Sequence, residues 1–177
     1  QSGSIGKLWA VKFRAAHAGP AEFGCSEYFC KWLFNEGLNG AGALMDYCCY
    51  GCVLSAFLLG LPESVTAMTG GQVKDSLTVE DNALIAMKYS LGMSSAEASW
   101  TQIGKLTSYT TALYGTEGTL LVEPRMGGRL LLATETDPQG GEVPVLDSPP
   151  YLQNSANHFV HVISQDAEPW MLCHPTN

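Results

Sequence analysis

Two polar residues, Asp46 and Tyr50, interrupt the most apolar stretch of this chain, residues 42–60, which reads GALMDYCCYGCVLSAFLLG. A separation of four residues places both side chains on one face of a helix, where they can be hydrogen-bond neighbours. A lone charge in a nearly continuous apolar helix is costly unless it has a partner or faces a cleft. The pair is therefore a candidate edge of an active site.

Two simpler interpretations of this pair stay open from spacing alone. Asp46 lies near the start of the expected helix, where the helix dipole favours a carboxylate whether or not the residue does chemistry. Tyr50 could equally be a core residue whose hydroxyl finds a partner inside the domain. Exposure of both side chains would favour the active-site interpretation, and burial of both would favour the structural one.

Three of the six cysteines lie in the same stretch, at positions 48, 49 and 52. No second pair at a familiar spacing completes a tetrahedral metal site, so we expect reduced, packed cysteines and no metal. His158 and His161 lie three residues apart without an evident third ligand. His17 follows an expected strand, and is either a ligand contact or an ordinary surface histidine.

Composition and charge limit the function of this chain. With 177 residues, 46% of them hydrophobic, it is long enough for one domain with a full core. A net charge of −8 and only nine scattered Lys and Arg residues argue against a nucleic-acid partner or an anionic membrane surface. The apolar run 47–61 is shorter than the roughly 18 to 20 residues of a membrane-spanning helix. With reduced cysteines, this predicts a cytoplasmic protein.

Hydrophobic periodicity predicts helices on both sides of a block of strands. Residues 8–15 alternate as a strand, with Trp9, Val11 and Phe13 on one face. Residues 26–35 and 43–59 are expected helices, separated by a glycine-rich loop at 36–42. The later expected strands are 64–72, 81–90, 94–102, 108–116, 118–124 and 128–136, and a last helix is expected at 154–165.

This order of elements predicts an α+β fold. Helices separated from a block of sequential strands indicate an open, predominantly antiparallel mixed sheet with helices packed on one face. No internal repeat or linker is evident, so residues 1–177 are expected to form a single domain. Strands such as 94–102 and 108–116 carry Ser, Thr and small residues on one face, which could meet solvent or a second sheet in a dimer.

Several segments together resemble the glucose–fructose oxidoreductase / inositol dehydrogenase / MocA (Gfo/Idh/MocA) family. GAGALMDYCCYGCVLSAFLLGLPESVTA is similar to that family's glycine-led helix with Asp, three residues, then His or Tyr, followed by a Leu-Gly-x-Pro turn and a strand. EDNALIAMKYSLGMSSAEASWTQ resembles the next two strands, YGTEGTLLVEP a Gly-x-x-Gly strand start, and HFVHVISQDAEP the late helix. The resemblance extends from about residue 5 to 176.

The resemblance implies a two-domain enzyme of which only one domain is present. In such enzymes an N-terminal Rossmann domain binds NAD or NADP and carries a catalytic lysine in a Glu-Lys-Pro motif. Neither that domain nor an initiator methionine is found in these residues. We therefore expect the C-terminal substrate-binding and oligomerisation domain, truncated at both ends, with the cofactor site in the missing domain and no cofactor bound by this chain alone.

The resemblance also assigns roles to the candidate residues. Asp46 and Tyr50 match the Asp-x-x-x-His/Tyr positions, so Tyr50 would carry or orient a proton and Asp46 would position the substrate or the carrier. A free tyrosine has a pKa of about 10 and needs a nearby cation to work near neutrality, which in the family is the lysine of the missing domain. His17 would contact the substrate at the cleft edge.

These inferences predict the C-terminal domain of an NAD(P)-dependent oxidoreductase acting on a sugar or polyol hydroxyl, inactive in isolation. A homo-oligomer formed through the sheet face is expected, without nucleic-acid or membrane partners. Two alternatives share the same fold: a non-catalytic dimerisation module and a sugar-sensing module.

Overall fold

The computed structural model describes residues 3–71, 73–74, 77–123, 128–145 and 147–170. The chain divides into two compact units, Gln1–Val143 and Pro144–Asn177, and each is described by itself. The prediction that residues 1–177 form one domain stays a prediction.

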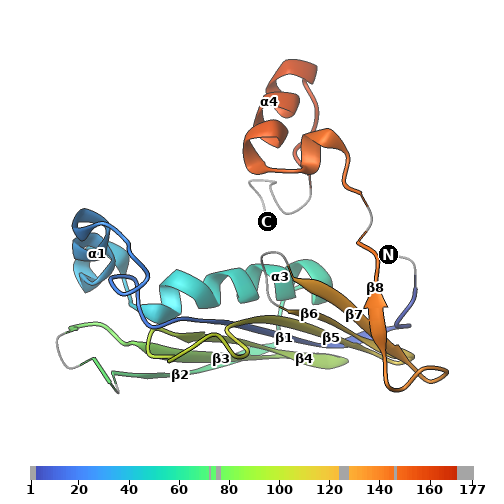
Figure 1. The fold of residues 1–177 in the computed structure, drawn as a ribbon, viewed down its shortest axis with the longest axis horizontal. Helices are drawn as coiled ribbons and strands as arrows, with labels where there is room; N and C mark the ends of the chain where they lie inside the picture. The colour runs from blue at the N-terminus through green and yellow to red at the C-terminus, as the bar shows by residue number, and fades with distance from the viewer. Residues whose placement is uncertain (1–2, 72, 75–76, 124–127, 146, 171–177) are drawn as a thin grey trace. The chain divides into compact units, whose positions relative to one another are not determined.

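The first unit is built on a mixed sheet, which has eight strands within the described residues (Figure 1). The strands are β1 (Leu8–Ala16), β2 (Ser64–Gly70), β3 (Asn82–Tyr89), β4 (Gly92–Ser99), β5 (Tyr109–Gly115), β6 (Gly118–Glu123), β7 (Arg129–Thr134) and β8 (Gly141–Val143). Their order is β2-β3-β4-β1-β5-β6-β7-β8. β1 runs parallel to β4, and the other described pairs are antiparallel. The predicted open, mostly antiparallel mixed sheet is confirmed.

The helices of this unit lie on one face of the sheet, as predicted (Figure 1). They are α1 (Glu27–Leu33), α2 (Glu36–Asn39), the π-helical turn η1 (Leu44–Cys48) and α3 (Cys49–Leu59). η1 and α3 pack on β4 and β1. Gly51 permits this close approach, because a Cβ at that position would lie 2.6 Å from the Cβ of Ala96. The core between the layers includes Leu33, Cys48, Ala96 and Trp100, all at most 1% exposed.

The segment 36–42, expected as a glycine-rich loop, contains the short helix α2. The Asn35 side chain accepts a hydrogen bond from the Leu38 N–H at 3.2 Å and so caps the helix start. Gly40, with φ of +83°, ends the helix in the left-handed conformation that glycine adopts at low cost. Two local capping signals therefore override the loop that the glycine content suggested.

The stretch Glu36–Leu59 is long and apolar enough, by length and composition, to cross a membrane. This is weak evidence, because the core helix of a globular domain passes the same test. In this structure the stretch is not one helix, since α2 ends at Gly40 and the π-helical turn begins at Leu44.

The second unit contains a 3-10 turn, η2 (Pro150–Leu152), and helix α4 (Ser155–Gln165), which confirms the last predicted helix. The Asn154 side chain caps α4 by accepting from the Asn157 N–H at 2.8 Å. The buried ring of His158 accepts a hydrogen bond from the Trp170 N–H at 2.9 Å through Nε2, and His161 stacks on Tyr151. Both histidines therefore pack within their own unit.

Candidate active site

The sheet topology brings three separate segments to one edge of the first unit. β1 and β4 are parallel and end at the same edge, which is followed by His17 and by Trp100. β5 runs antiparallel to β1 and begins there, so Tyr109 pairs with Ala15. η1 packs against β4, β3 and β1, and thereby adds Asp46 to this group.

Asp46 is half-buried and faces the end of β4. Its Oδ2 accepts a hydrogen bond from the indole Nε1–H of Trp100 at 3.0 Å. Burial raises the pKa of this carboxyl, while the Trp100 hydrogen bond and the nearby His17 partly oppose the rise. A partly buried carboxyl whose pKa is shifted by burial beside a histidine is the kind of group that often lies at functional sites.

The start of the helix is satisfied by Glu80 rather than by Asp46. One Glu80 carboxylate oxygen, Oε1, accepts hydrogen bonds from the N–H groups of Gly42 and Leu44 at 2.8 and 2.9 Å, and the Glu80 carbonyl accepts from the Ala43 N–H. These amide groups would otherwise lack partners at a helix start. The interpretation of Asp46 as a simple helix-start charge is weakened, because another carboxylate fills that role.

Replacing Glu80 with alanine is expected to lower the free energy of unfolding by about 1–2 kcal/mol, since amide groups at the helix start lose their acceptor. Glu80→Gln keeps an oxygen that can accept both bonds and should lose much less. Urea unfolding of the two variants measures the difference. Equal losses in both variants would contradict the capping role.

His17 is buried, at 8% exposure, which excludes an ordinary surface histidine. Its Nδ1 accepts a hydrogen bond from the Gly19 N–H at 2.9 Å, so the neutral ring carries its hydrogen on Nε2. Burial lowers the pKa of His17, and the Asp46 carboxylate opposes this by raising it. Burial therefore drives both groups toward their neutral forms, while the attraction between their charges opposes it.

The loops around His17 are tied together by an ion pair between Lys74 and Glu22. Lys74 lowers the pKa of the Glu22 carboxyl. The fully buried Asp81 holds the Lys74 segment by accepting from the N–H groups of Val73 and Lys74 at 3.0 and 2.9 Å. These contacts position the loop that supports the His17 ring.

Tyr50 lies in the first turn of α3 and is 54% exposed. Its ring centroid lies 6.3 Å from that of Tyr47, which in turn lies 5.3 Å from the His17 ring. The expected α-helical spacing from Asp46 to Tyr50 does not apply directly, because residues 44–48 form a π-helical turn. Such turns often occur at functional sites, where they redirect side chains.

Three residues of this cluster were missed by sequence reasoning. They are Trp100, Tyr47 and Tyr109. The Trp100 indole donates a hydrogen bond to Asp46, and the hydroxyls of Tyr47 and Tyr109 lie 3.1 Å apart. No motif or spacing signals these contacts, because their partners are 54 and 62 positions apart in the chain. They arise only when β4, β1 and β5 are placed side by side.

The described cysteines are packing residues. Cys25, Cys30, Cys48, Cys49 and Cys52 are all free thiols, whereas Cys173 lies outside the described residues. Cys48 is buried, its Sγ is 3.4 Å from the Ala96 carbonyl oxygen, and burial raises its pKa to about 12. Within the described residues, no group of three or more His, Cys, Asp or Glu side chains could hold a metal ion.

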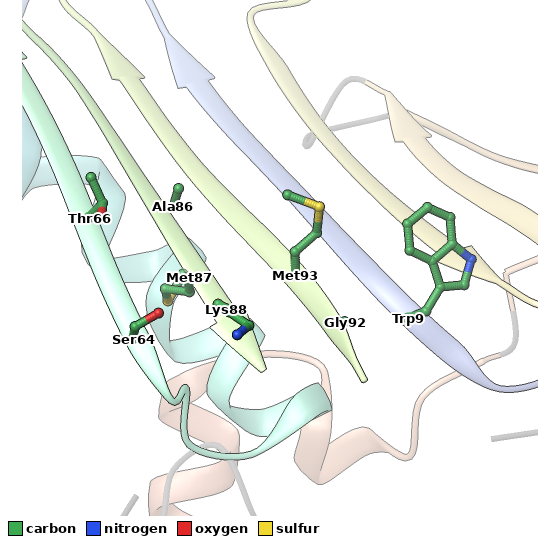
Figure 2. Close-up of a pocket in the computed structure, with 8 residues that line it drawn as sticks. All are labelled: Trp9, Ser64, Thr66, Ala86, Met87, Lys88, Gly92 and Met93. Carbon is green, nitrogen blue, oxygen red and sulfur yellow. The ribbon is translucent and has the colours of Figure 1, made fainter. Parts of the chain in front are cut away.

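A pocket of about 450 Å³ lies away from this cluster, on the sheet face opposite α3 (Figure 2). Trp9 and Met93 line it, together with residues of β2 and β3. Trp9, expected on the same face as Val11 and Phe13, is 44% exposed, whereas those two are buried. The register of β1 against β5 shifts between Leu8 and Ala10, and this irregularity accounts for the different placement of Trp9.

Comparison with solved structures shows a shared fold. An oxidoreductase from Agrobacterium radiobacter in complex with NAD+, L-tartaric acid and magnesium has a TM-score of 0.69 at 20% identity, covering 95% of this chain and 50% of that chain. An inositol dehydrogenase homolog from Azotobacter vinelandii complexed with NAD+ has a TM-score of 0.66 at 21% identity, covering 80% and 37%. Levoglucosan dehydrogenase in complex with NADH and levoglucosan has a TM-score of 0.67 at 19% identity, covering 93% and 49%.

This chain spans half or less of the length of these three structures. At these identities the likeness shows the fold alone.

Comparison with curated proteins gives no match. The family described as GFO/IDH/MocA C-terminal domain matches residues 1–121, which is more than half of the chain. The chain therefore belongs to the GFO/IDH/MocA C-terminal domain family.

Proposed function

We propose that this chain is the substrate-binding part of an NAD(P)-dependent oxidoreductase that acts on a hydroxyl group of a sugar or polyol. The observation that carries the proposal is the cluster of Asp46, His17 and Tyr50 at one edge of the sheet. The Tyr50 phenol is exposed, and burial raises the pKa of the Asp46 carboxyl. The similar solved structures with NAD+ or NADH and with levoglucosan support the cofactor and substrate class.

In this proposal Tyr50 transfers the proton of the substrate hydroxyl, and Asp46 and His17 position the substrate for that transfer. Tyr50, the exposed member, exchanges a proton with the substrate oxygen within hydrogen-bond reach. Asp46, held by Trp100, orients the substrate or the carrier. His17 is buried, so its Nε2–H serves best at the inner wall of the site. In this proposal the neutral His17 ring contacts the part of the substrate that reaches furthest in.

Among the residues that the structure describes, the glycine-preceded helix start does not fit a dinucleotide phosphate. A helix start preceded by glycines can bind phosphate through its amide groups, and residues 40–44 are the candidate for such a site here. The N–H groups of Gly42 and Leu44 are already bonded to the Glu80 carboxylate. A second negative charge would be repelled there, so we place the cofactor outside these residues and expect none to bind this chain alone.

The isolated chain is expected to give no turnover of sugars or polyols with NAD or NADP, because the proposal places the cofactor site outside these residues. The full-length gene product should give turnover. Absorbance of the reduced nicotinamide measures both against a panel of D-glucose, L-sorbose, levoglucosan and myo-inositol. Cofactor-dependent turnover by the chain alone would contradict the proposal. Sugar binding without turnover by the full-length protein would favour the sensing module.

We also propose that the sheet face opposite the helices forms a homo-oligomer, as expected from the sequence. Met93 and Met68 are 57% and 64% exposed on this face, and Trp9 lies beside Met93 at the pocket (Figure 2). Exposed large apolar side chains on a sheet face are a common feature of interfaces. A cytoplasmic location, also expected from the sequence, is part of the same proposal.

Placing a charge on this face should separate the subunits. Met93→Glu is expected to weaken self-association by about 100-fold or more, because the glutamate would be buried without a partner in the interface. Leu38→Glu, at a 64% exposed apolar position on α2, is the matched control and should leave association unchanged. Sedimentation equilibrium measures both, and a monomeric wild-type chain at high concentration would refute the interface.

A further inference from the structure

The hydroxyl groups of Tyr47 and Tyr109 meet at a junction between the helix layer and the sheet. Tyr47 belongs to η1 and Tyr109 begins β5, and their oxygens lie 3.1 Å apart. The Tyr47 ring is a neighbour of both His17, at 5.3 Å, and Tyr50, at 6.3 Å. The hydroxyl pair therefore lies next to His17 and Tyr50. The proposed reaction gives this pair no role.

The distance between the two hydroxyls indicates a weak mutual hydrogen bond. An O–H···O bond usually measures about 2.7–2.8 Å, so a separation of 3.1 Å is long. Both side chains are only half-buried, and exchanging a weak neutral bond for bonds to a ligand costs little. The pair is thus suited to change partners when a ligand arrives.

The chemistry of the pair selects a particular ligand group. Each tyrosine hydroxyl has one hydrogen to donate and two lone pairs that accept. Two adjacent neutral hydroxyls match a vicinal diol, whose two oxygens also lie side by side and both donate and accept. An anionic group would instead call for arginine or lysine. The aromatic rings of Tyr47, Tyr50 and Tyr109 offer apolar surface to the C–H groups of a sugar or polyol.

We propose that Tyr47 and Tyr109 bind the two oxygens of a vicinal diol in the substrate and thereby place a hydroxyl of that substrate at Tyr50. This inference rests on the proposed function and narrows its substrate class to sugars or polyols that carry a diol next to the reacting carbon. Tyr47 and Tyr109 are then substrate-binding residues that determine specificity.

The test compares Tyr47→Phe and Tyr109→Phe with wild type in the full-length protein. The probes are D-glucose, L-sorbose and levoglucosan, each alongside its monodeoxy analogues. We expect each variant to raise KM for the best diol substrate about 5- to 10-fold while kcat changes little, because one neutral hydrogen bond is lost. Wild type should prefer the diol over the deoxy analogue, and both variants should lose that preference.

Tyr89→Phe is the control for a purely structural loss. The Tyr89 hydroxyl lies 3.3 Å from the Ser94 hydroxyl in the core, so its removal should lower stability without altering the diol preference. A diol preference that persists in both Tyr47→Phe and Tyr109→Phe would overturn the inference. So would an equal loss of preference in Tyr89→Phe.

Equilibrium dialysis of the same sugars separates this inference from the proposed reaction. If wild type binds D-glucose better than its deoxy analogues without oxidising it, and the two variants lose that difference, the inference holds although the oxidoreductase function fails. If wild type binds none of the three sugars, both are overturned.

Discussion

Replacing Tyr50 with phenylalanine in the full-length protein is expected to lower kcat for the proposed sugar or polyol substrate by about 10²- to 10⁴-fold. Positioned proton transfer contributes about this much to catalysis, and phenylalanine removes the proton carrier while keeping the ring. KM should change little, because the exposed ring and its contact with Tyr47 remain. Steady-state kinetics with reduced-nicotinamide absorbance measures both constants.

The control for this loss is Tyr28→Phe, which removes a tyrosine hydroxyl from a side chain that is 85% exposed on α1, outside the site. Its kcat should equal that of wild type. A Tyr50→Phe variant with wild-type kcat would exclude Tyr50 as the proton carrier and direct attention to His17.

Replacing Asp46 with asparagine is expected to have opposite effects on activity and stability. Asparagine still presents an oxygen to the Trp100 indole, but it lacks the charge that orients the proton carrier. We expect kcat/KM of the full-length protein to fall by about 100-fold. We expect wild-type kcat/KM to fall at low pH as Asp46 becomes protonated, and this fall should be absent from the variant's pH profile.

The stability effect of Asp46→Asn follows from the raised pKa of the carboxyl. A folded-state pKa above the unfolded value means that the folded chain binds more protons between the two pKa values, so ionised Asp46 reduces stability as pH rises through that range. Removing the charge should therefore raise the free energy of unfolding by about 0.5–2 kcal/mol at pH 8. The gain should shrink toward pH 4, where the carboxyl approaches its neutral form in both states.

Urea unfolding of wild type and Asp46→Asn at pH 4, 6 and 8 measures this dependence. His17 contributes with the opposite sign, because its lowered pKa removes stability as pH falls below its ordinary value of 6.5. In Asp46→Asn the carboxylate that raises the pKa of His17 is gone, so His17 removes somewhat more stability from the variant at low pH, which adds to the shrinkage of the gain. A pH-independent difference would mean that the environment of Asp46 does not favour its neutral form.

Local signals in the sequence were enough for most secondary structure. Ser26 and Asn154 cap α1 and α4 as polar cap residues do, and α3 ends at Gly60. The alternation of β3 correctly indicated its buried face, with Ala83 and Met87 inside. These features depend on residues within one turn or one strand of each other, which is why the sequence alone was informative.

The candidate site was only partly accessible to the same reasoning. Asp46 and Tyr50 stood out because a lone charge in an apolar helix is costly, and His17 because it follows an expected strand; the resemblance then placed His17 at the cleft edge. Their catalytic and substrate-binding roles stay predictions. The sequence did not separate an N-terminal helix charge from an active-site carboxylate, because that choice depends on whether another residue, Glu80, satisfies the helix start.

Residue types and spacing were enough to identify an α+β chain of the GFO/IDH/MocA C-terminal type with a polar pair in an apolar helix. The surroundings of that pair depend on tertiary packing: the Trp100 indole on Asp46, the buried His17 and the Tyr47–Tyr109 hydroxyls. The order of the strands explains this. Parallel pairing of β1 with β4 and antiparallel pairing of β1 with β5 bring distant segments to one edge, and no periodicity within a segment encodes which strands pair.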